Sequence, residues 1–225
     1  VYGGVIVSNA DLHLGDEPHL PKAYGGNNHG SIVEMAGQWY IFYHRQTNGH
    51  WYSRQVCAEP IEFRADGSII QAEITSCGLN GGPLKDEGSY EARIACHLYS
   101  KNGTCESLPD QQNENHPAFT QEGEDRMENP NQYINNMVDG ATAGYRYFNF
   151  TDAATLSVEV RGNGKGNFVV RDERGGKIVS CIPVEPSQAW KTFSAPLVIE
   201  KGKHPLYFTF EGEGSMDFFS FSFGK

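Results

Sequence analysis

The sequence predicts an all-β protein in which a meander of short strands is followed by an antiparallel β-sandwich. Three observations lead to this fold class. Glycine is frequent, with 26 copies in 225 residues, and aromatic side chains make up 12%. Long segments with the 3.6-residue period of a helix are missing. Short apolar segments instead alternate with clusters of turn residues, which is typical of strands and hairpins.

The first predicted unit is built around a strand at residues 38–44. This segment reads QWYIFYH, so apolar or aromatic side chains point to both of its faces. A strand without a polar face has to be covered on both sides. Turns at Ala36-Gly37 and Asn48-Gly49 separate it from strands predicted at 31–35 and 50–57, and Asn-Gly is a strong hairpin signal. A meander covered on both faces is expected for one blade of a β-propeller.

Further strands are expected on either side of this meander. Residues 1–9 and residues 68–75 are each predicted to form one. The run CGLNGGP at 77–83 is a turn cluster that no helix or strand tolerates, so the domain boundary is placed there. The chain is therefore expected to divide into units at 1–84 and 85–225.

The second unit carries the period-2 pattern of strands with one buried and one wet face. Apolar and polar residues alternate around residues 156–160, 206–210 and 219–223. Turn residues divide several short strands at regular spacing. The pattern predicts an antiparallel sandwich or jelly roll, in which two sheets pack face to face. Residues 101–131 are rich in Asn, Gln, Glu and Pro and are expected to be mostly loop.

The net charge narrows the class of partner. The chain has 18 Lys and Arg against 28 Asp and Glu, a formal charge of −10. Nucleic acids and anionic membranes need a basic face, so this balance argues against both as partners. No apolar run approaches the roughly 20 residues of a membrane span. A neutral partner such as a glycan is compatible with this charge.

The N-terminus and the cysteines give weaker information. Residue 1 is Val and the sequence opens within a predicted strand, so we interpret the N-terminus as a cut end with any targeting segment upstream. The five cysteines lack metal-ligand spacing, and their odd number leaves at least one unpaired in a monomer. Buried free thiols are favoured for most of them, and a Cys96–Cys105 bridge remains an alternative.

Several consecutive segments of the first unit resemble the last blade of glycoside hydrolase family 43. The similarity runs from about residue 3 to residue 83 and rests on the segments GGVIVSN, NNHGSIVE, QWYIFYHR, YSRQ and AEPI. The resemblance implies part of a five-bladed propeller enzyme that removes arabinofuranosyl or xylosyl units from arabinoxylan-type polysaccharides. It also implies N-terminal propeller blades as partners, and a secreted or periplasmic location is favoured.

The family's catalytic groups are not expected in this chain. Family 43 enzymes use an Asp base, a Glu acid and a third Asp that orients the acid, and all three come from the first three blades. Glu34, Glu59 and Glu62 match blade or loop positions and are interpreted as structural. The chain alone is therefore predicted to be inactive, because glycoside hydrolysis needs two carboxyl groups across the scissile bond.

The same resemblance makes His29 and Arg54 candidate substrate-binding residues. His29 matches a histidine that points toward the propeller axis, near a metal ion or the bottom of the sugar pocket, and neutral imidazole is a suitable ligand there. The alternative is a histidine that satisfies nearby turn carbonyls. Arg54 matches an arginine that reaches sugar hydroxyls, and its alternative is a buried ion pair between blades. His44 and Arg45 end the preceding strand and are expected to be loop-facing supports.

The second unit resembles, more loosely, the family 6 carbohydrate-binding modules that are often appended to family 43 enzymes. The matching segments are YEAR, WKTFSAPL and GSMDFF. Trp190 takes the place of a sugar-stacking aromatic with Tyr133 and Tyr145 as candidate partners, and its alternative is a core or edge tryptophan. The resemblance implies a structural calcium ion. In this chain, however, Arg93 replaces the second glutamate of the first-strand motif, and Ser215 replaces an asparagine that meets the sugar.

Two other functions remain open. The chain could be a non-catalytic xylan-binding sandwich that carries a propeller remnant, or the sandwich could serve only as an interdomain prop. Xylan binding that disappears in Trp190→Ala would favour the first of these over the second.

Overall fold

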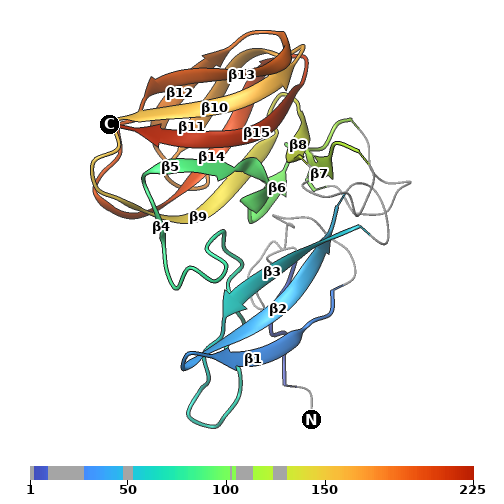
Figure 1. Cartoon of the computed structure of the whole chain (residues 1–225), viewed down its shortest axis with the longest axis vertical. Helices are drawn as coiled ribbons and strands as arrows, with labels where there is room; N and C mark the ends of the chain where they lie inside the picture. Colours follow the sequence, from blue (N-terminus) through green and yellow to red (C-terminus); the bar gives the residue numbers. More distant parts are fainter. Residues whose placement is uncertain (1–2, 10–27, 48–52, 102, 105–113, 124–130) are drawn as a thin grey trace.

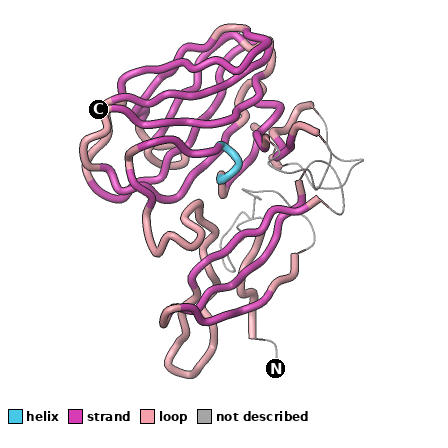
Figure 2. The backbone as a smooth tube through the Cα atoms, viewed as in Figure 1, coloured by secondary structure: helices cyan, strands magenta, loops and turns pink. Residues whose placement is uncertain are grey.

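The computed structural model describes residues 3–9, 28–47, 53–101, 103–104, 114–123 and 131–225 (Figure 1). The predicted all-β class is confirmed, because this part of the chain contains fifteen strands and a single 3₁₀ helix, η1 (Ala92–Ile94). Figure 2 shows this helix as one short turn beside the sandwich. Three residues are far too few to cross a membrane, and no other helix occurs in the described segments.

A three-stranded antiparallel sheet forms the lower end of the molecule in Figure 1. Its order is β1 (Ser31–Met35), β2 (Gln38–Gln46) and β3 (Arg54–Pro60). Ala36 and Gly37 join β1 to β2 with φ angles of 51° and 80°. Positive φ at both central positions is the mark of a type I′ turn, whose twist matches that of the strands. The strand predictions at 31–35 and 38–44 are confirmed, whereas the predicted Asn48-Gly49 turn lies outside the described residues.

The edge strand β1 and the central strand β2 of this sheet differ in how well they are covered. All residues of β1 are exposed. In β2, Tyr40, Ile41 and Tyr43 are only 7% to 8% exposed. Four large apolar side chains of β1 and β2 are each 36% to 39% exposed, namely Ile32, Val33, Met35 and Trp39. The sheet therefore buries its centre and presents an apolar edge along β1.

The strands predicted at residues 1–9 and 68–75 are wrong. The described residues of these segments form no continuous ladder with a neighbouring strand. The Ala72 amide donates to the Ile6 carbonyl at 2.7 Å, which is one backbone hydrogen bond between the two segments and not a ladder. Ile6 and Ala72 nevertheless pack against Ile41. The apolar pattern that suggested strands is thus satisfied by packing on β2 rather than by strand pairing.

From residue 84 onward, the described residues form two six-stranded sheets packed face to face. We call the first the outer sheet; in order it contains β13 (Ser187–Pro196), β10 (Thr155–Gly162), β15 (Met216–Gly224), β8 (Gln132–Met137) and β7 (Ala118–Gln121), with β5 (Gly88–Glu91) also paired to β15. The second contains β12 (Ile178–Val184), β11 (Lys165–Arg171), β14 (Gly202–Glu213), β9 (Thr142–Phe150) and β4 (Leu84–Lys85), with β6 (His97–Tyr99) paired to β9. This is the predicted sandwich.

Aromatic rings from both sheets fill the space between them. Tyr145, Phe208 and Phe221 are fully buried, and the ring centroids of Tyr145 and Phe208 lie 4.6 Å and 5.0 Å from that of Phe221. Burial of such large rings supplies much of the stabilisation of a sandwich. Tyr145, one of the two candidate partners of Trp190, therefore belongs to the core, and that candidate assignment is wrong.

A β-bulge changes the expected alternation in the last strand. In the pairing of β10 with β15, Glu159 lies opposite Ser220 but Val160 lies opposite Phe218, so Phe219 is the extra residue. Because a bulge breaks the period of two, Phe218 is fully buried and Phe219 is only partly covered. Phe219 was expected on the same face as Phe221, and the bulge is the reason that it is not.

Candidate functional site

The solvent-facing side of the outer sheet carries a group of aromatic and charged residues, which we call the Trp190 surface. Val160 and Phe218 are fully buried, so their neighbours Arg161 and Asp217, which lie opposite each other, point away from the core. The group consists of Trp190 on β13, Arg161 on β10, Asp217 and Phe219 on β15, Tyr133 on β8 and Glu122 just after β7. Strand pairing thus brings together residues that are far apart in sequence.

Three aromatic rings of this surface lie in contact. The centroid of Trp190 is 5.0 Å from that of Phe219, with an angle of 33° between the ring planes. It is 5.4 Å from that of Tyr133, with the planes at 72°. Trp190 and Tyr133 are both only partly covered. Trp190 therefore lies on the surface of the sandwich and not in its core, and Tyr133 is its neighbour as expected.

Arg161 lies in the middle of the Trp190 surface. Its guanidinium carbon is 4.2 Å from the centroid of Trp190 and 5.0 Å from that of Tyr133. Its Nε donates to Asp217 Oδ2 at 3.1 Å, and its Nη1 donates to Glu122 Oε1 at 2.5 Å. The arginine is therefore held by two carboxylates while it lies against two aromatic rings.

The two carboxyl groups differ in their electrostatic environment. Burial raises the pKa of Asp217, and the hydrogen bond from Arg161 offsets part of that effect. Hydrogen bonds from Asn131 and Arg161, with a smaller one from the Trp190 side chain, lower the pKa of Glu122. One guanidinium against two carboxylates leaves the Trp190 surface with a net charge of −1 when all three groups are ionised. Aromatic faces beside hydroxyl-binding polar groups suit a neutral sugar.

His29 lies immediately before β1, at the other end of the molecule. Its ring is exposed and its centroid lies 4.5 Å from that of His44, with the planes at 75°. Its backbone carbonyl is 3.1 Å from His44 Nδ1. Glycine at position 30 allows the backbone to pass this close to β2, because a Cβ at residue 30 would fall 1.7 Å from the Phe42 carbonyl oxygen. The described residues contain no group of three or more His, Cys, Asp or Glu side chains that could hold a metal ion, so a metal at His29 stays a prediction.

Arg54 begins β3 opposite Gln46 and is exposed. Within the described residues Arg54 is not buried, because its side chain lies at the open end of the strand; its contact with a sugar or with another blade stays a prediction. His29 and Arg54 belong to the three-stranded sheet, whereas Trp190 lies on β13 at the far end of the sandwich (Figure 1). The three predicted binding residues do not converge on one site.

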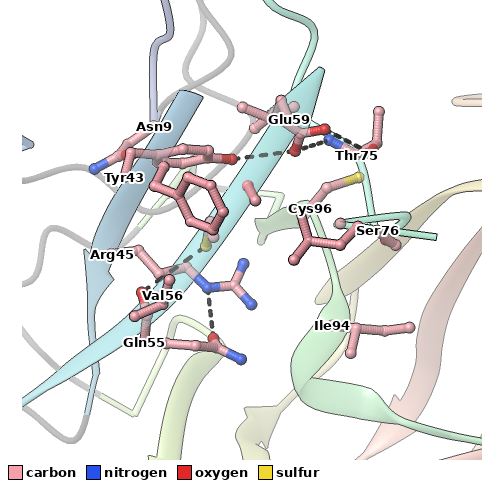
Figure 3. Close-up of a pocket in the computed structure, with 16 residues that line it drawn as sticks. Asn9, Tyr43, Arg45, Gln55, Val56, Glu59, Thr75, Ser76, Ile94 and Cys96 are labelled. Atoms are coloured by element: carbon pink, nitrogen blue, oxygen red, sulfur yellow. Dashed lines mark hydrogen bonds between the residues drawn. The ribbon is translucent and has the colours of Figure 1, made fainter. Parts of the chain in front are cut away.

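A cavity of about 260 Å³ lies where the three-stranded sheet meets the sandwich (Figure 3). Glu59 is 1% exposed at its edge, and its Oε1 accepts the Thr75 amide at 2.7 Å and the Tyr43 hydroxyl at 3.3 Å. Its Oε2 accepts the Thr75 hydroxyl at 2.7 Å. Burial raises the pKa of Glu59 to about 7. A buried carboxyl with such a pKa in a cavity is a candidate acid, but both of its oxygens are used within the chain, which fits the structural role expected for it.

Arg45 connects the two parts of the molecule beside this cavity. Its Nε donates to Gln55 Oε1 at 2.7 Å, and its guanidinium donates to the carbonyl oxygens of Arg93 and Ala95. Its guanidinium carbon lies 3.7 Å from the ring centroid of Phe119 on β7. Arg45 was expected to be a loop-facing support, and it is instead a tie between β2 and the sandwich.

The residues at the expected calcium position do not fit a cation. The Arg93 guanidinium forms an ion pair with Glu91, and its Nη1 donates to Gln132 Oε1 at 3.0 Å. The Arg93 guanidinium thus neutralises Glu91, which is the one carboxylate of the YEAR segment. Calcium prefers six to eight oxygen ligands, and the described residues gather no acidic cluster there or elsewhere.

No family model matches the chain. It is 47% identical over 225 residues, 98% of its length, to a xylosidase/arabinosidase of Thermoclostridium stercorarium. It is 25% identical over 214 residues to an arabinoxylan arabinofuranohydrolase of Paenibacillus polymyxa. The chain spans 47% and 32% of the lengths of these two relatives.

Solved structures agree with this relationship at the level of the fold. A glycoside hydrolase family 43 arabinoxylan arabinofuranohydrolase of Bacillus subtilis, in complex with cellotetraose, matches 89% of this chain and 41% of its own with a TM-score of 0.58 and 21% identity. The module CsCBM6-3 of Clostridium stercorarium, in complex with cellobiose, matches 64% of this chain and 98% of its own with a TM-score of 0.51 and 17% identity. The resemblance to a family 43 glycoside hydrolase with an appended family 6-like sandwich is thereby confirmed.

The sequence reasoning missed Arg161, Glu122 and Asp217. Each is a charged residue next to a buried one, which is ordinary for a strand with a wet face. Only the strand order β13-β10-β15-β8-β7 places them beside Trp190. A useful signal would have been an arginine and an aspartate on the polar faces of two strands that are both predicted to be central.

Proposed function

We propose that this chain is part of a glycoside hydrolase that removes arabinofuranosyl or xylosyl units from arabinoxylan-type polysaccharides, and that its sandwich holds the polysaccharide at the Trp190 surface. The observation that carries the activity is the 47% identity to a xylosidase/arabinosidase along 98% of the chain. The observation that supports the binding role is the group of Trp190, Tyr133 and Phe219 on an accessible sheet face.

Further propeller blades are the proposed partners of the three-stranded sheet. The exposed apolar side chains of β1 support this, because Ile32, Val33 and Met35 are large and lie on an edge strand that pairs only with β2 among the described residues. An apolar strand edge is prone to pair with another strand. The catalytic Asp and Glu residues are proposed to lie on those blades, so the chain alone is expected to release no sugar from arabinoxylan.

Isothermal titration of the 225-residue chain with xylohexaose tests the binding role. We expect saturable binding by the native chain and a loss of at least tenfold in affinity in Trp190→Ala, since stacking on an indole is a main source of affinity for sugars. Trp39→Ala is the matched control, because this tryptophan is also on a strand surface, at 38% exposure, but belongs to β2. Equal binding by the native chain and Trp190→Ala would remove the Trp190 surface from the proposal.

A non-catalytic carbohydrate-binding protein is the second candidate, and the Trp190 surface supports it equally well. The reading frame upstream of Val1 separates the two candidates. A frame that encodes further blades bearing two Asp and one Glu at inner strand ends supports the enzyme. A start codon directly before Val1 supports the binding protein.

A further inference from the structure

We propose that Arg161 gates the Trp190 surface: its guanidinium covers the indole when no ligand is bound, and a neutral sugar ring stacks on Trp190 only after Arg161 has moved away. This inference rests on the proposed carbohydrate-binding role of that surface. It identifies Arg161 as a residue that sets both the affinity of the Trp190 surface for sugar and the access of sugar to the indole.

The distances leave no space for a sugar ring between Trp190 and Tyr133, or on the indole face over which Arg161 lies. Stacked carbon atoms are separated by about 3.5–4.0 Å, so a sugar held between two rings needs them about 7–8 Å apart. The centroids of Trp190 and Tyr133 are only 5.4 Å apart, with planes at 72°. The Arg161 guanidinium carbon, at 4.2 Å from the Trp190 centroid, occupies the stacking distance itself.

Three neighbouring side chains already contact the indole. Arg161 lies over its ring, Phe219 lies against it at 5.0 Å, and Tyr133 meets it edge to face. Of these neighbours, Phe219 and Tyr133 are rigid rings, whereas Arg161 has a long flexible side chain. Arg161 is therefore the neighbour that can uncover the indole at the smallest structural cost.

The ion pairs that hold Arg161 are accessible to water. The side chains of Arg161, Asp217 and Glu122 are 25%, 27% and 39% exposed. Exposed ion pairs contribute little free energy because water and salt compete with them. The guanidinium can leave the indole by breaking its pair with Glu122, the more exposed carboxylate, while it keeps its pair with the more buried Asp217, so opening the site does not strand a buried charge.

Acrylamide quenching of Trp190 fluorescence tests whether Arg161 covers the indole without any sugar. Trp39 and Trp51 are replaced by Phe, so that Trp190 is the only tryptophan of the chain. We expect Arg161→Ala in this background to be quenched about twofold more strongly than its parent. The matched control is Arg171→Ala, since Arg171 is 24% exposed and pairs with Glu211 at 3.3 Å on the opposite sheet. Equal quenching in Arg161→Ala and its parent would overturn the proposal.

Titration with xylohexaose tests the gate itself. We expect Arg161→Ala to bind about fivefold or more tightly than the native chain, because the sugar no longer displaces a cation–π contact. Arg171→Ala should bind like the native chain. Weaker binding by Arg161→Ala would show that the guanidinium contacts the sugar and would overturn the gate, while the carbohydrate-binding role would stand. No binding by the native chain, Arg161→Ala or Arg171→Ala would overturn the binding role and the gate together.

Discussion

The guanidinium carbon of Arg45 lies 3.7 Å from the ring centroid of Phe119, and this contact joins strand β2 to strand β7 of the sandwich. The same guanidinium donates to the carbonyl oxygens of Arg93 and Ala95 beside η1. One side chain therefore provides both a stacking contact and charged hydrogen bonds across the junction. Such a contact keeps the three-stranded sheet in a fixed orientation relative to the sandwich.

Arg45→Ala is expected to weaken this junction by about 2–4 kcal/mol, from the lost cation–π contact and charged hydrogen bonds. Calorimetry should show the native transition at a lower temperature or split into two. Arg64→Ala is the matched control, because Arg64 is exposed and donates only to Ser68 and Ile69 in its own loop. An unchanged melting curve for Arg45→Ala would contradict the role of Arg45 as a tie.

The pH dependence of stability is expected to reveal Glu59. Burial raises its pKa from 4.5 to about 7, so the folded chain binds a proton there that the unfolded chain has lost between pH 4.5 and pH 7. The free energy of unfolding should therefore fall as pH rises through this window, by on the order of 3 kcal/mol. Glu59→Gln keeps an acceptor for the Thr75 amide and should flatten the curve. A native chain that is equally stable at pH 5 and pH 8 would argue against this.

Asp86 should have the opposite effect at acid pH. Burial by itself would raise its pKa, but hydrogen bonds from the amides of Thr151, Ala153 and Asp152 and from the Thr151 hydroxyl lower it to about 2. These bonds tie the start of the sandwich to the turn after β9. The folded pKa lies below the unfolded value, so the stabilisation is present above about pH 4 and is lost as pH falls through 2.

Asp86→Asn is expected to cost about 2 kcal/mol at neutral pH, measured by urea unfolding, with the difference from the native chain disappearing near pH 2. Asp66→Asn is its control, because Asp66 also accepts hydrogen bonds within a turn, from Ser68, but is exposed. A difference between native and Asp86→Asn chains that persists unchanged to pH 2 would mean that the charge of Asp86 is not its source.

Removal of calcium is expected to leave this sandwich unaffected. The guanidinium of Arg93, which replaces the second glutamate of the motif, forms an ion pair with Glu91. The melting temperature should therefore be the same in EDTA and in millimolar calcium. In Arg93→Glu, two carboxylates replace the ion pair, and calcium that binds only the folded state should then raise the melting temperature. A fall in melting temperature of the native chain in EDTA would reveal a calcium site that these residues do not explain.

The local patterns of the sequence were sufficient for most strands of the sandwich. Leu206, Phe208 and Phe210 alternate with more polar residues, and all three are fully buried in β14. Where the alternation of apolar and polar residues is interrupted, the local sequence does not predict the structure correctly. Residues 68–75 look like a strand because Ile69, Ala72 and Ile74 are apolar, yet they only pack against β2 and its neighbours. A periodic apolar pattern reports burial, and burial can be met by packing without a ladder.

The candidate site was likewise predictable from the sequence only in part. Trp190 was found from a resemblance in sequence, and Tyr133 was named as its possible neighbour. Arg161, Glu122 and Asp217 join them because β10, β15 and β8 lie side by side in the sheet, and the phase of each strand turns these residues outward. The spacing of these residues along the chain does not predict that they lie together.

The sequence by itself determined that this protein is all-β, that a meander precedes a sandwich, and that it resembles family 43 glycoside hydrolases, since short-range periodicity and consecutive motifs carry that information. Only the tertiary structure decided that Arg45 ties β2 to Phe119, that Phe219 leaves the core at a bulge, and that Arg161 covers Trp190. The physical reason is that these contacts depend on the register and order of paired strands, and both are fixed by packing across the whole chain.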